Sequence, residues 1–137
     1  MRVFFDSSAF AKRHVLERGS DDAIAWCERA SELALSIIAI PEVLSAFARL
    51  RREGSLDDRQ YADLKAALLS DVEDALICDM TVDVVAVSID VLEASPLRAM
   101  DAIHVAAALE CGAKVFVSAD ARQCAAASLF ELQVVQL

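Results

Sequence analysis

Apolar residues group along the chain into two kinds of segment. Five runs of three or four mostly apolar residues have the length and composition of buried strands: Val3–Phe5, Leu33–Ser36, Ala75–Cys78, Val115–Val117 and Leu132–Val135. Between these runs, apolar residues recur at helical spacing and predict seven helices: Ser7 to about Leu16, Ser20–Ala30, Pro41–Glu53, Ser55 to about Ser70, Val82–Ala94, Arg98–Glu110 and Asp120–Ser128. The fourth is opened by Ser55-Leu56-Asp57-Asp58, which resembles a capping box.

Strands that alternate with helices indicate an α/β fold with a mostly parallel five-stranded sheet. The helices on either side of Gly54 are joined by a very short link, so we expect an antiparallel helical hairpin there. The chain has 137 residues, which fits a single domain over residues 1–137. Its 26 Ala against 3 Gly and 2 Pro favour helix and disfavour an all-β fold rich in tight turns.

Composition narrows the class of protein further. No apolar run reaches the length of about 18 residues that a membrane span needs, and the start of the chain is a poor signal peptide. The four cysteines form no CxxC pair and no zinc-like spacing, so we expect reduced thiols in a cytoplasmic protein. Residues 57–101 carry 11 acidic and 3 basic side chains of a chain whose net charge is −9. This balance excludes a protein that coats nucleic acid through charge alone.

Four acidic residues follow the predicted strands in positions where α/β proteins bind ligands, outside the carboxyl ends of the sheet. Asp6 and Asp120 come directly after the first and fourth strands, and Glu42 lies in the first turn of the helix that follows the second. Asp101 opens a helix among apolar neighbours. We therefore expect the four carboxylates to meet at one edge of the sheet.

Carboxylates brought together repel one another, and a hard divalent cation relieves that repulsion. Mg²⁺ or Mn²⁺ prefers oxygen ligands, activates water and neutralises charge on a phosphodiester. Each acid taken alone has a structural alternative. Asp6 and Asp120 are also suited to cap helices, and Glu42 to interact with a helix dipole.

The four acids lie in four short segments of recognisable form. These segments read Val3-Phe4-Phe5-Asp6-Ser7-Ser8-Ala9, Pro41-Glu42-Val43-Leu44-Ser45-Ala46, Arg98-Ala99-Met100-Asp101-Ala102-Ile103-His104-Val105-Ala106-Ala107-Ala108 and Val117-Ser118-Ala119-Asp120. In this order and spacing they resemble the motifs of PIN-domain ribonucleases, and most closely those of the VapC-type toxins of bacterial toxin–antitoxin pairs. The resemblance runs from Val3 to about Val135. Two departures are Ser118, where Thr is common, and Ser128–Glu131, which replaces the usual Gly before the last strand.

The resemblance implies a PIN-like three-layer α/β/α fold with a protruding helical hairpin, and a metal-dependent endoribonuclease. Asp6, Glu42, Asp101 and Asp120 would bind Mg²⁺ or Mn²⁺, and Ser8 and Ser118 would support the site. A metal-bound water would attack phosphorus and leave a 5′-phosphate and a 3′-hydroxyl. The usual targets are structured RNAs of translation (tRNA or rRNA), the usual partner is a VapB-type antitoxin whose C-terminal segment covers the active site, and the usual state is a homodimer.

Basic residues and histidines add further candidates. The only basic concentration consists of Lys12, Arg13, Arg49, Arg51 and Arg52, which form either a solvated surface or a contact for RNA phosphates or the antitoxin. His104 lies three residues after Asp101, and we expect a structural or hydrogen-bonding role for it. His14, between basic and apolar neighbours, is expected to be exposed.

Three other functions compete with a ribonuclease. A phosphoacceptor signalling domain would need a second acid beside Asp6 and a Lys after a late strand, whereas Lys114 precedes its strand. A PIN fold without catalytic activity, serving as a binding module, is disfavoured by the four intact acids. A metal-dependent phosphatase or DNase would use the same carboxylates, so the sequence leaves that alternative open.

Overall fold

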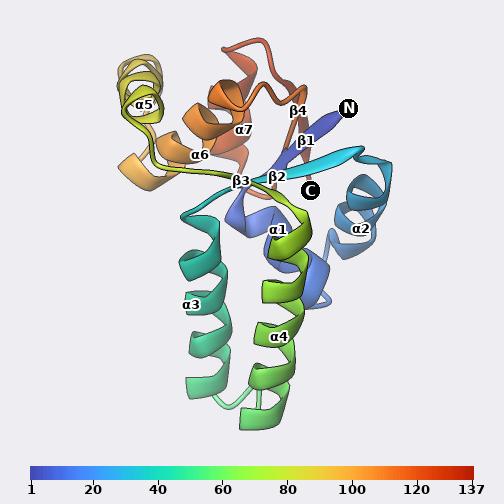
Figure 1. The fold of residues 1–137 in the computed structure, drawn as a ribbon. Helices are drawn as coiled ribbons and strands as arrows, with labels where there is room; N and C mark the ends of the chain where they lie inside the picture. Colours follow the sequence, from blue (N-terminus) through green and yellow to red (C-terminus); the bar gives the residue numbers. More distant parts are fainter.

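The computed structural model describes all residues 1–137, and its centre is one five-stranded sheet in which every pairing is parallel (Figure 1). The strands lie in the order β3-β2-β1-β4-β5. Their bounds are β1 (Arg2–Phe5), β2 (Glu32–Ser36), β3 (Leu76–Cys78), β4 (Val115–Ser118) and β5 (Gln133–Gln136). The helices are α1 (Ser7–His14), α2 (Ser20–Arg29), α3 (Ala39–Arg52), α4 (Asp58–Asp74), α5 (Val82–Ala94), α6 (Ala99–Glu110) and α7 (Ala121–Ser128).

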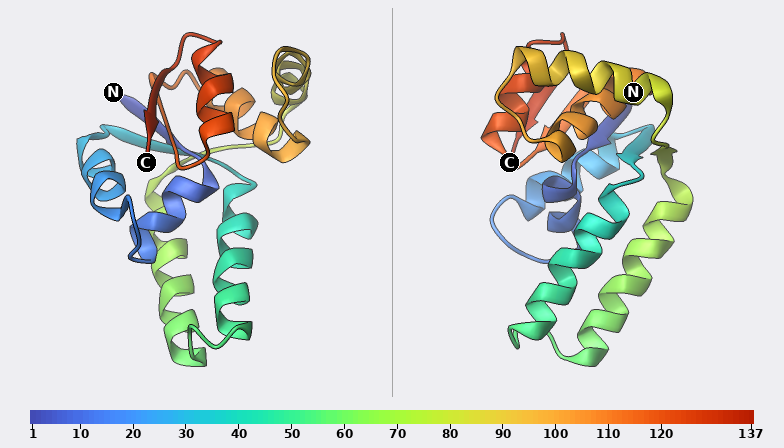
Figure 2. Two further views of the ribbon diagram at one scale, coloured as in Figure 1. Left: turned by 180° about the vertical axis from the view of Figure 1, so that it is seen from behind. Right: turned by 90° about the vertical axis from the view of Figure 1, so that its left-hand side faces the viewer.

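Helices cover both faces of the sheet, as the two views in Figure 2 show. On one face, Val3, Phe5 and Leu35 pack with apolar residues of α1, α3 and α4. On the other face, Phe4 and Phe116 pack with α5, α6 and α7, and their rings stack at a centroid distance of 5.7 Å. Successive strand residues therefore enter opposite cores, which explains why the strands are continuous apolar runs instead of alternating ones. The expected three-layer α/β/α fold is confirmed.

Helices α3 and α4 form the expected hairpin, which projects away from the sheet (Figure 1). Gly54 ends the turn after α3 with a φ of 82°, a left-handed conformation that glycine adopts without steric cost. A capping box starts α4, because the Asp57 side chain accepts from the backbone of Gln60 and the Gln60 side chain accepts from the backbone of Asp57. The turn between α3 and α4 is thus encoded by the local sequence on both of its sides.

Three helices have boundaries that differ from the sequence prediction by two residues or more. Helix α4 extends to Asp74, four residues beyond the predicted end at about Ser70. Helix α1 ends at His14 instead of about Leu16, because Val15 takes an extended conformation. Helix α3 begins at Ala39, two residues before Pro41, so the proline lies inside the first turn, where its missing N–H has no helical partner to lose. None of these shifts moves a predicted acid of the site off its element. None of the helices combines the length and the apolar character needed to span a membrane.

The strand order creates a site for ligands beside the central strand. The chain builds β1, β2 and β3 outward in one direction, and then returns to place β4 and β5 on the other side of β1. Parallel sheets bind ligands outside the carboxyl ends of the strands where the order reverses in this way. Phe5 pairs with Val117 at this point, so the residues that follow β1 and β4 are brought together.

Candidate active site

Asp6 occupies the reversal point of the sheet and is completely buried. Its backbone N–H donates to the carbonyl of Val117 at 3.1 Å, which extends the pairing of β1 with β4 by one residue. Its side chain caps α1 by accepting a hydrogen bond of 2.9 Å from the N–H of Ala9. The residue therefore joins the sheet to the helix, and its carboxylate is held rigidly by both.

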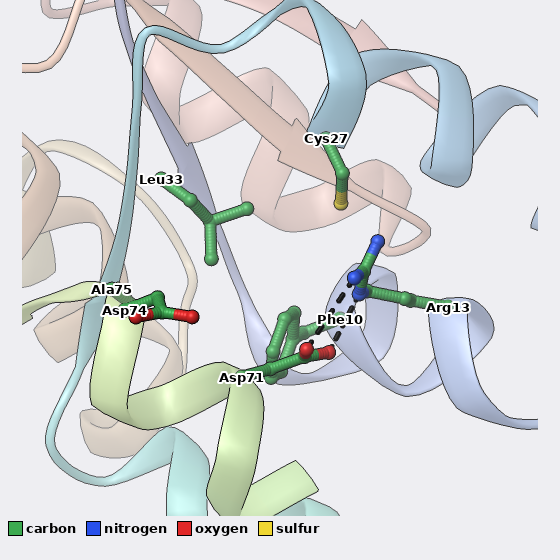
Figure 3. Close-up of a pocket in the computed structure, with 7 residues that line it drawn as sticks. All are labelled: Phe10, Arg13, Cys27, Leu33, Asp71, Asp74 and Ala75. Atoms are coloured by element: carbon green, nitrogen blue, oxygen red, sulfur yellow. Dashed lines mark hydrogen bonds and ion pairs between the residues drawn. The ribbon is translucent and has the colours of Figure 1, made fainter. Parts of the chain in front are cut away.

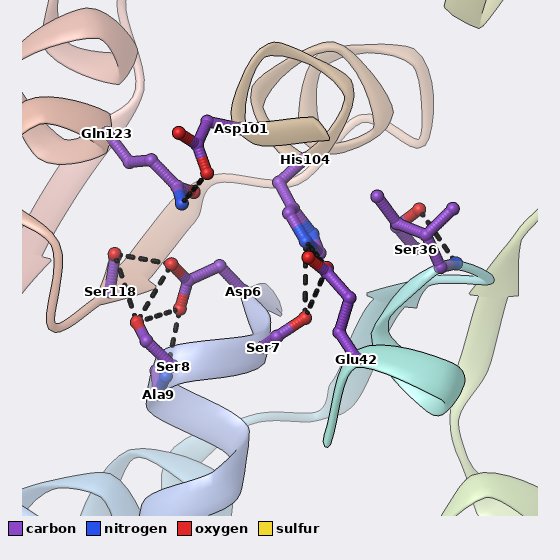
Figure 4. Close-up of polar contacts among 11 residues, drawn as sticks. Asp6, Ser7, Ser8, Ala9, Ser36, Glu42, Asp101, His104, Ser118 and Gln123 are labelled. Atoms are coloured by element: carbon purple, nitrogen blue, oxygen red, sulfur yellow. Dashed lines mark hydrogen bonds and ion pairs between the residues drawn. The ribbon is translucent and has the colours of Figure 1, made fainter. Parts of the chain in front are cut away.

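Two serines complete the surroundings of this carboxylate (Figure 4). Ser118 donates to Asp6 Oδ2 at 2.6 Å, and Ser8 lies 2.7 and 2.9 Å from the two oxygens. The serine oxygens in turn accept from the backbone N–H groups of Asp120 and Ala119, which fixes both hydroxyls. Burial raises the pKa of Asp6, and the hydrogen bonds from Ser118, Ala9 and Ser8 offset only part of that rise.

Glu42 lies in the first turn of α3 and is joined to two other side chains. Ser7 donates to its Oε1 at 2.7 Å, and Nε2 of His104 lies 2.5 Å from the same oxygen. Burial would raise the pKa of Glu42, but the hydrogen bonds from His104 and Ser7 outweigh it, so the pKa falls below its usual value. Glu42 is therefore ionised at neutral pH, and His104 has the hydrogen-bonding role that the sequence indicated.

Asp101 and Asp120 begin the next two helices. Asp101 lies in the first turn of α6, and its Oδ1 accepts a hydrogen bond of 3.0 Å from Nε2 of Gln123 on α7. Asp120 is the N-cap of α7, where its Oδ1 accepts from the backbone N–H of Arg122 at 2.9 Å. The helix-cap alternative considered for Asp6 and Asp120 is thus also realised.

The predicted acids are brought to the same edge of the sheet, although not into one tight cluster. Figure 4 shows Asp6 at the centre, with Asp101 and Gln123 on one side and Glu42 and His104 on the other. No group of three or more His, Cys, Asp or Glu side chains lies close enough together to hold a metal ion. Asp120, at the start of α7, faces its own helix through the bond to Arg122.

The oxygen atoms that remain suit a hard divalent cation. The hydrogen bonds to Glu42, Asp101 and Asp120 each fall on one carboxylate oxygen, so the second oxygen of each accepts none. Free carboxylate oxygens are the donor type that Mg²⁺ and Mn²⁺ prefer. The donor chemistry of the site therefore fits the metal that the sequence predicts.

Three polar residues contribute to the site beyond those singled out as candidate ligands. Ser7 and His104 hold Glu42, and Gln123 holds Asp101. Gln123 is 5% exposed, and its Oε1 is buried without a hydrogen-bond partner, as is Nδ1 of His104. The signal that could have found Gln123 is its position three residues after Asp120, on a short helix that begins at the site.

Two of the expected phosphate contacts are engaged within the protein. Arg13 pairs with Asp71 of α4 at 2.6 Å beside Phe10, Cys27 and Leu33 (Figure 3), and Lys12 donates to the carbonyl of Arg18 at 2.7 Å. These bonds join α1 to α4 and to the following loop. Lys12 and Arg13 therefore stabilise the fold through these contacts, which leave their side chains little freedom to bind RNA phosphates.

His14 is not exposed, contrary to the expectation from its neighbours. Its side chain is 5% exposed and lies edge-on to the rings of Phe10 and Phe47, because α1 turns this position toward the hairpin. Burial lowers the pKa of His14, and the nearby charge of Asp71 opposes that effect. The basic neighbours in the sequence gave the wrong expectation, because in the folded chain the imidazole lies against the rings of Phe10 and Phe47 and beside the Asp71 carboxylate.

The remaining basic residues lie at the far end of α3. Arg49 and Arg52 are exposed, and the guanidinium of Arg51 lies 4.1 Å from the ring centroid of Tyr61 on α4. Arg49 is 3.9 Å from Glu53 in a surface pair of the kind that adds little to stability. Arg49 and Arg52 are thus the two expected contact residues that remain available to a partner.

Comparison with known proteins agrees with the fold and the motifs. The model of the PIN domain family matches residues 3–129. Two ribonucleases of Mycobacterium tuberculosis, VapC45 of strain CDC 1551 / Oshkosh and VapC49 of strain H37Rv, are each 33% identical to this chain over 114 residues. The aligned part is 80% of this chain and 76% of each relative.

Solved structures with the same fold include other proteins of this kind. VapC20 of Mycobacterium tuberculosis, a Sarcin-Ricin loop cleaving toxin, has a TM-score of 0.67 at 19% identity and covers 90% of this chain and 94% of its own. VapBC2 of Rickettsia felis, bound to promoter DNA, has a TM-score of 0.72 at 11% identity and covers 100% and 99%. At these identities the likeness shows the fold alone. The match to the family model and the identity with the two VapC ribonucleases establish that this chain belongs to the PIN-domain family and is of the VapC type.

Proposed function

We propose that this chain is a Mg²⁺- or Mn²⁺-dependent endoribonuclease and the toxin of a VapBC-type toxin–antitoxin pair. It would act on structured RNA, tRNA or rRNA, in the cytoplasm. The VapC ribonucleases that share 33% of its sequence support this function. The observation that carries it is the completely buried carboxylate of Asp6, flanked by further acids at the reversal point of a parallel sheet.

Each side chain of the site has a part in this proposal. Asp6, Glu42, Asp101 and Asp120 would hold the metal ion. Ser8 and Ser118 fix the Asp6 carboxylate, and Ser118 also accepts the backbone N–H of Asp120, which links two of the four acids. A divalent ion bound here would supply a water activated for attack on phosphorus and positive charge for the phosphodiester.

Cleavage of RNA by the purified chain tests this proposal. We expect cleavage of tRNA or rRNA in Mg²⁺ or Mn²⁺, none in EDTA, and new ends with a 5′-phosphate. Asp6→Asn and Asp101→Asn should each lower the rate at least 100-fold, because a charged ligand is lost. Asp90→Asn on the exposed surface of α5 is the matched control and should cleave like the parent chain.

The same experiment separates the competing functions. Full activity of Asp6→Asn or Asp101→Asn would contradict the site assignment. Binding of RNA without cleavage in any divalent metal would favour a PIN fold that serves as a binding module. Cleavage of DNA or of small phosphate esters in place of RNA would favour a metal-dependent phosphatase or DNase.

The proposed partner is a VapB-type antitoxin. Several structures with this fold were solved as toxin–antitoxin complexes, including VapBC-1 of nontypeable Haemophilus influenzae with a TM-score of 0.69. The excess of acidic residues over positions 57–101 would suit a basic segment of such a partner. Co-expression with the product of a neighbouring short reading frame tests this. We expect the two proteins to purify as a stable complex in which RNA cleavage is inhibited. If the chain purifies without the co-expressed protein, the proposed partner is wrong.

A further inference from the structure

His104 is a buried histidine that contacts the site through one nitrogen only. It lies on α6, is 1% exposed, and packs edge-on against Phe4 with ring centroids 6.3 Å apart. Nε2 is 2.5 Å from Oε1 of Glu42 and 3.2 Å from Oγ of Ser7. Nδ1 is buried and has no hydrogen-bond partner.

The direction of the hydrogen bond follows from the chemistry of Glu42. An ionised carboxylate has no proton to give, so Nε2 of His104 must carry the proton and donate it. Ser7 donates to the same Oε1. Two donors therefore fix one oxygen of Glu42 from two different helices, α1 and α6, while Oε2 accepts no hydrogen bond.

We propose that His104 is a positioning residue for Glu42, which it orients so that Oε2 is presented to the metal and substrate. This inference rests on the proposed function of the site. His104 does not touch the reacting atoms in this arrangement, so it is not a catalytic residue. Groups that orient a metal-binding side chain in this way typically contribute 10- to 100-fold to metal affinity or activity.

A role limited to packing explains the buried ring poorly. An unpartnered polar atom such as Nδ1 carries a desolvation penalty when it is buried, and an apolar side chain of similar size would avoid it. The ring packs edge-on against Phe4, which is completely buried, and no polar group contacts its Nδ1 side. The hydrogen bond to Glu42 through Nε2 is the interaction that only a polar side chain provides at this position.

Only Nε2 of His104 contacts Glu42, so variants that place a donor at the position of Nε2 or of Nδ1 can be told apart. The amide nitrogen of Gln is four bonds from Cα, as is Nε2 of His, whereas the amide nitrogen of Asn is three bonds away, as is Nδ1. His104→Gln should therefore restore the donor to Glu42, and His104→Asn should not reach it. His104→Leu keeps the volume of the ring approximately and removes the donor altogether.

We expect His104→Asn and His104→Leu to lower kcat for RNA about 10- to 100-fold with little change in KM, and His104→Gln to stay within a few-fold of the parent chain. Mn²⁺ affinity, measured by calorimetry, should fall in the same two variants and be rescued in His104→Gln. A positioning role predicts this rescue, whereas a packing role predicts that the apolar Leu variant is the least affected.

Other outcomes would overturn the inference. Parent-like Mn²⁺ affinity and kcat in folded His104→Asn and His104→Leu would do so, and so would equal losses in all three variants. If His104 variants fail to fold, Ser7→Ala removes the other donor to Oε1 and should lower Mn²⁺ affinity and kcat in the same direction. An unchanged Ser7→Ala would then contradict the proposed fixing of Oε1.

An NMR measurement separates this inference from the proposed function. The Nε2–H proton of His104 should give a resolved downfield signal in the parent chain that moves in Glu42→Gln. That result is expected whether or not the protein cleaves RNA. Absence of RNA cleavage together with an intact signal would reject the ribonuclease and keep the contact. Absence of any coupling between His104 and Glu42 would reject the positioning role itself.

Discussion

Asp6 is the only acidic side chain that folding buries completely. Burial raises its pKa, so the folded state binds a proton at this position more tightly than the unfolded chain does. As pH rises through the ordinary carboxyl pKa, the unfolded chain loses this proton first, and stability is lost until the pKa of the folded state is passed. Above the ordinary carboxyl pKa, burial of Asp6 therefore lowers the stability of the fold.

We predict that Asp6→Asn raises the Tm at pH 7 while abolishing RNA cleavage, because the neutral amide removes the cost of burying a carboxyl group that can ionise. Asn also caps helices well, so the start of α1 should survive. Thermal melts in EDTA at pH 7 measure the effect, with Asp90→Asn as the control. A lower Tm for Asp6→Asn would show that hydrogen bonds to the carboxylate outweigh the cost of its burial.

His14 gives the opposite dependence on pH. Burial lowers its pKa below the usual 6.5, so the unfolded chain takes up a proton that the folded ring resists. Stability contributed by this residue is therefore present above the usual pKa and is lost as pH falls below it. The Asp71 carboxylate, 3.3 Å from Nε2, reduces the effect without cancelling it.

We predict that the Tm of His14→Met falls less than the Tm of the parent chain when the pH is lowered from 7.5 to 5.5. Met is chosen because an unbranched apolar side chain adapts to the space between two aromatic rings. Circular dichroism melts at the two pH values in EDTA provide the comparison. Equal losses in the two proteins would mean that His14 takes up its proton without disturbing the fold.

At the scale of elements, the turn between α7 and β5 carries backbone strain. The glycine usual here in the family is absent, and Glu131 is the only residue other than glycine with a positive φ, at 65°. The left-handed conformation costs an L-residue roughly 1–2 kcal/mol. The turn therefore forms because β5 pairs with β4 and because the N–H groups of Leu129 and Phe130 donate to the carbonyls of Ala126 and Ala127, in spite of its own sequence.

We predict that Glu131→Gly increases the free energy of unfolding by about 0.5–1 kcal/mol, since relief of the left-handed strain exceeds the entropy that glycine adds to the unfolded chain. Glu131→Ala is the matched control, because it removes the same carboxylate and keeps the strain. Urea denaturation of the three proteins measures the difference. A gain for Glu131→Ala equal to that for Glu131→Gly would assign the effect to charge.

At the scale of the whole molecule, α5 leaves an apolar surface in water. It packs on α6 at the edge of the fold (Figure 2) and buries Val84, Ser88 and Val91. On its outer face an apolar row, spaced at helical intervals, stays 38–85% exposed: Val82, Val85, Ile89 and Leu92. A row of this kind is typical of a surface for protein–protein contact. We expect it to be the contact surface if the chain forms the homodimer that the family resemblance implies.

We predict that Ile89→Lys shifts the free protein from dimer to monomer, because a charged side chain would be buried without a partner in the contact. Light scattering after gel filtration measures the mass. Asp90→Lys, which changes charge on the same helix beside the row, should leave the mass as it is. A dimer that persists in Ile89→Lys would place the contact elsewhere on the molecule.

Much of the fold follows from local sequence. The apolar runs at Val3–Phe5 and Val115–Val117 are continuous because each strand is covered on both faces, and this pattern already indicated a parallel sheet. The hairpin was predictable from Gly54 and the capping residues that follow it, although the capping box lies at Asp57 and Gln60 and not at Ser55–Asp58 as predicted. The acids after the strands were identified for the same reason, because their position depends only on where a strand ends.

Side-chain partners in space could not be predicted in this way. Nothing along the chain links His104 to Glu42, since 62 residues separate them. Gln123 meets Asp101 only because α7 packs against α6. Arg13 resembled a free cation in the sequence and is paired with Asp71 on a helix more than fifty residues away. These contacts depend on the packing of helices on the two faces of the sheet.

The sequence by itself determined the succession of strands and helices, the acids at their ends and the family, because these depend on local spacing and short motifs. The tertiary structure alone decided the strand order β3-β2-β1-β4-β5, which places Asp6 beside Ser118. It also decided which oxygens of the acids are held by serine, histidine and glutamine, and which accept no bond. The physical reason is that burial and hydrogen bonding act between residues distant in the chain.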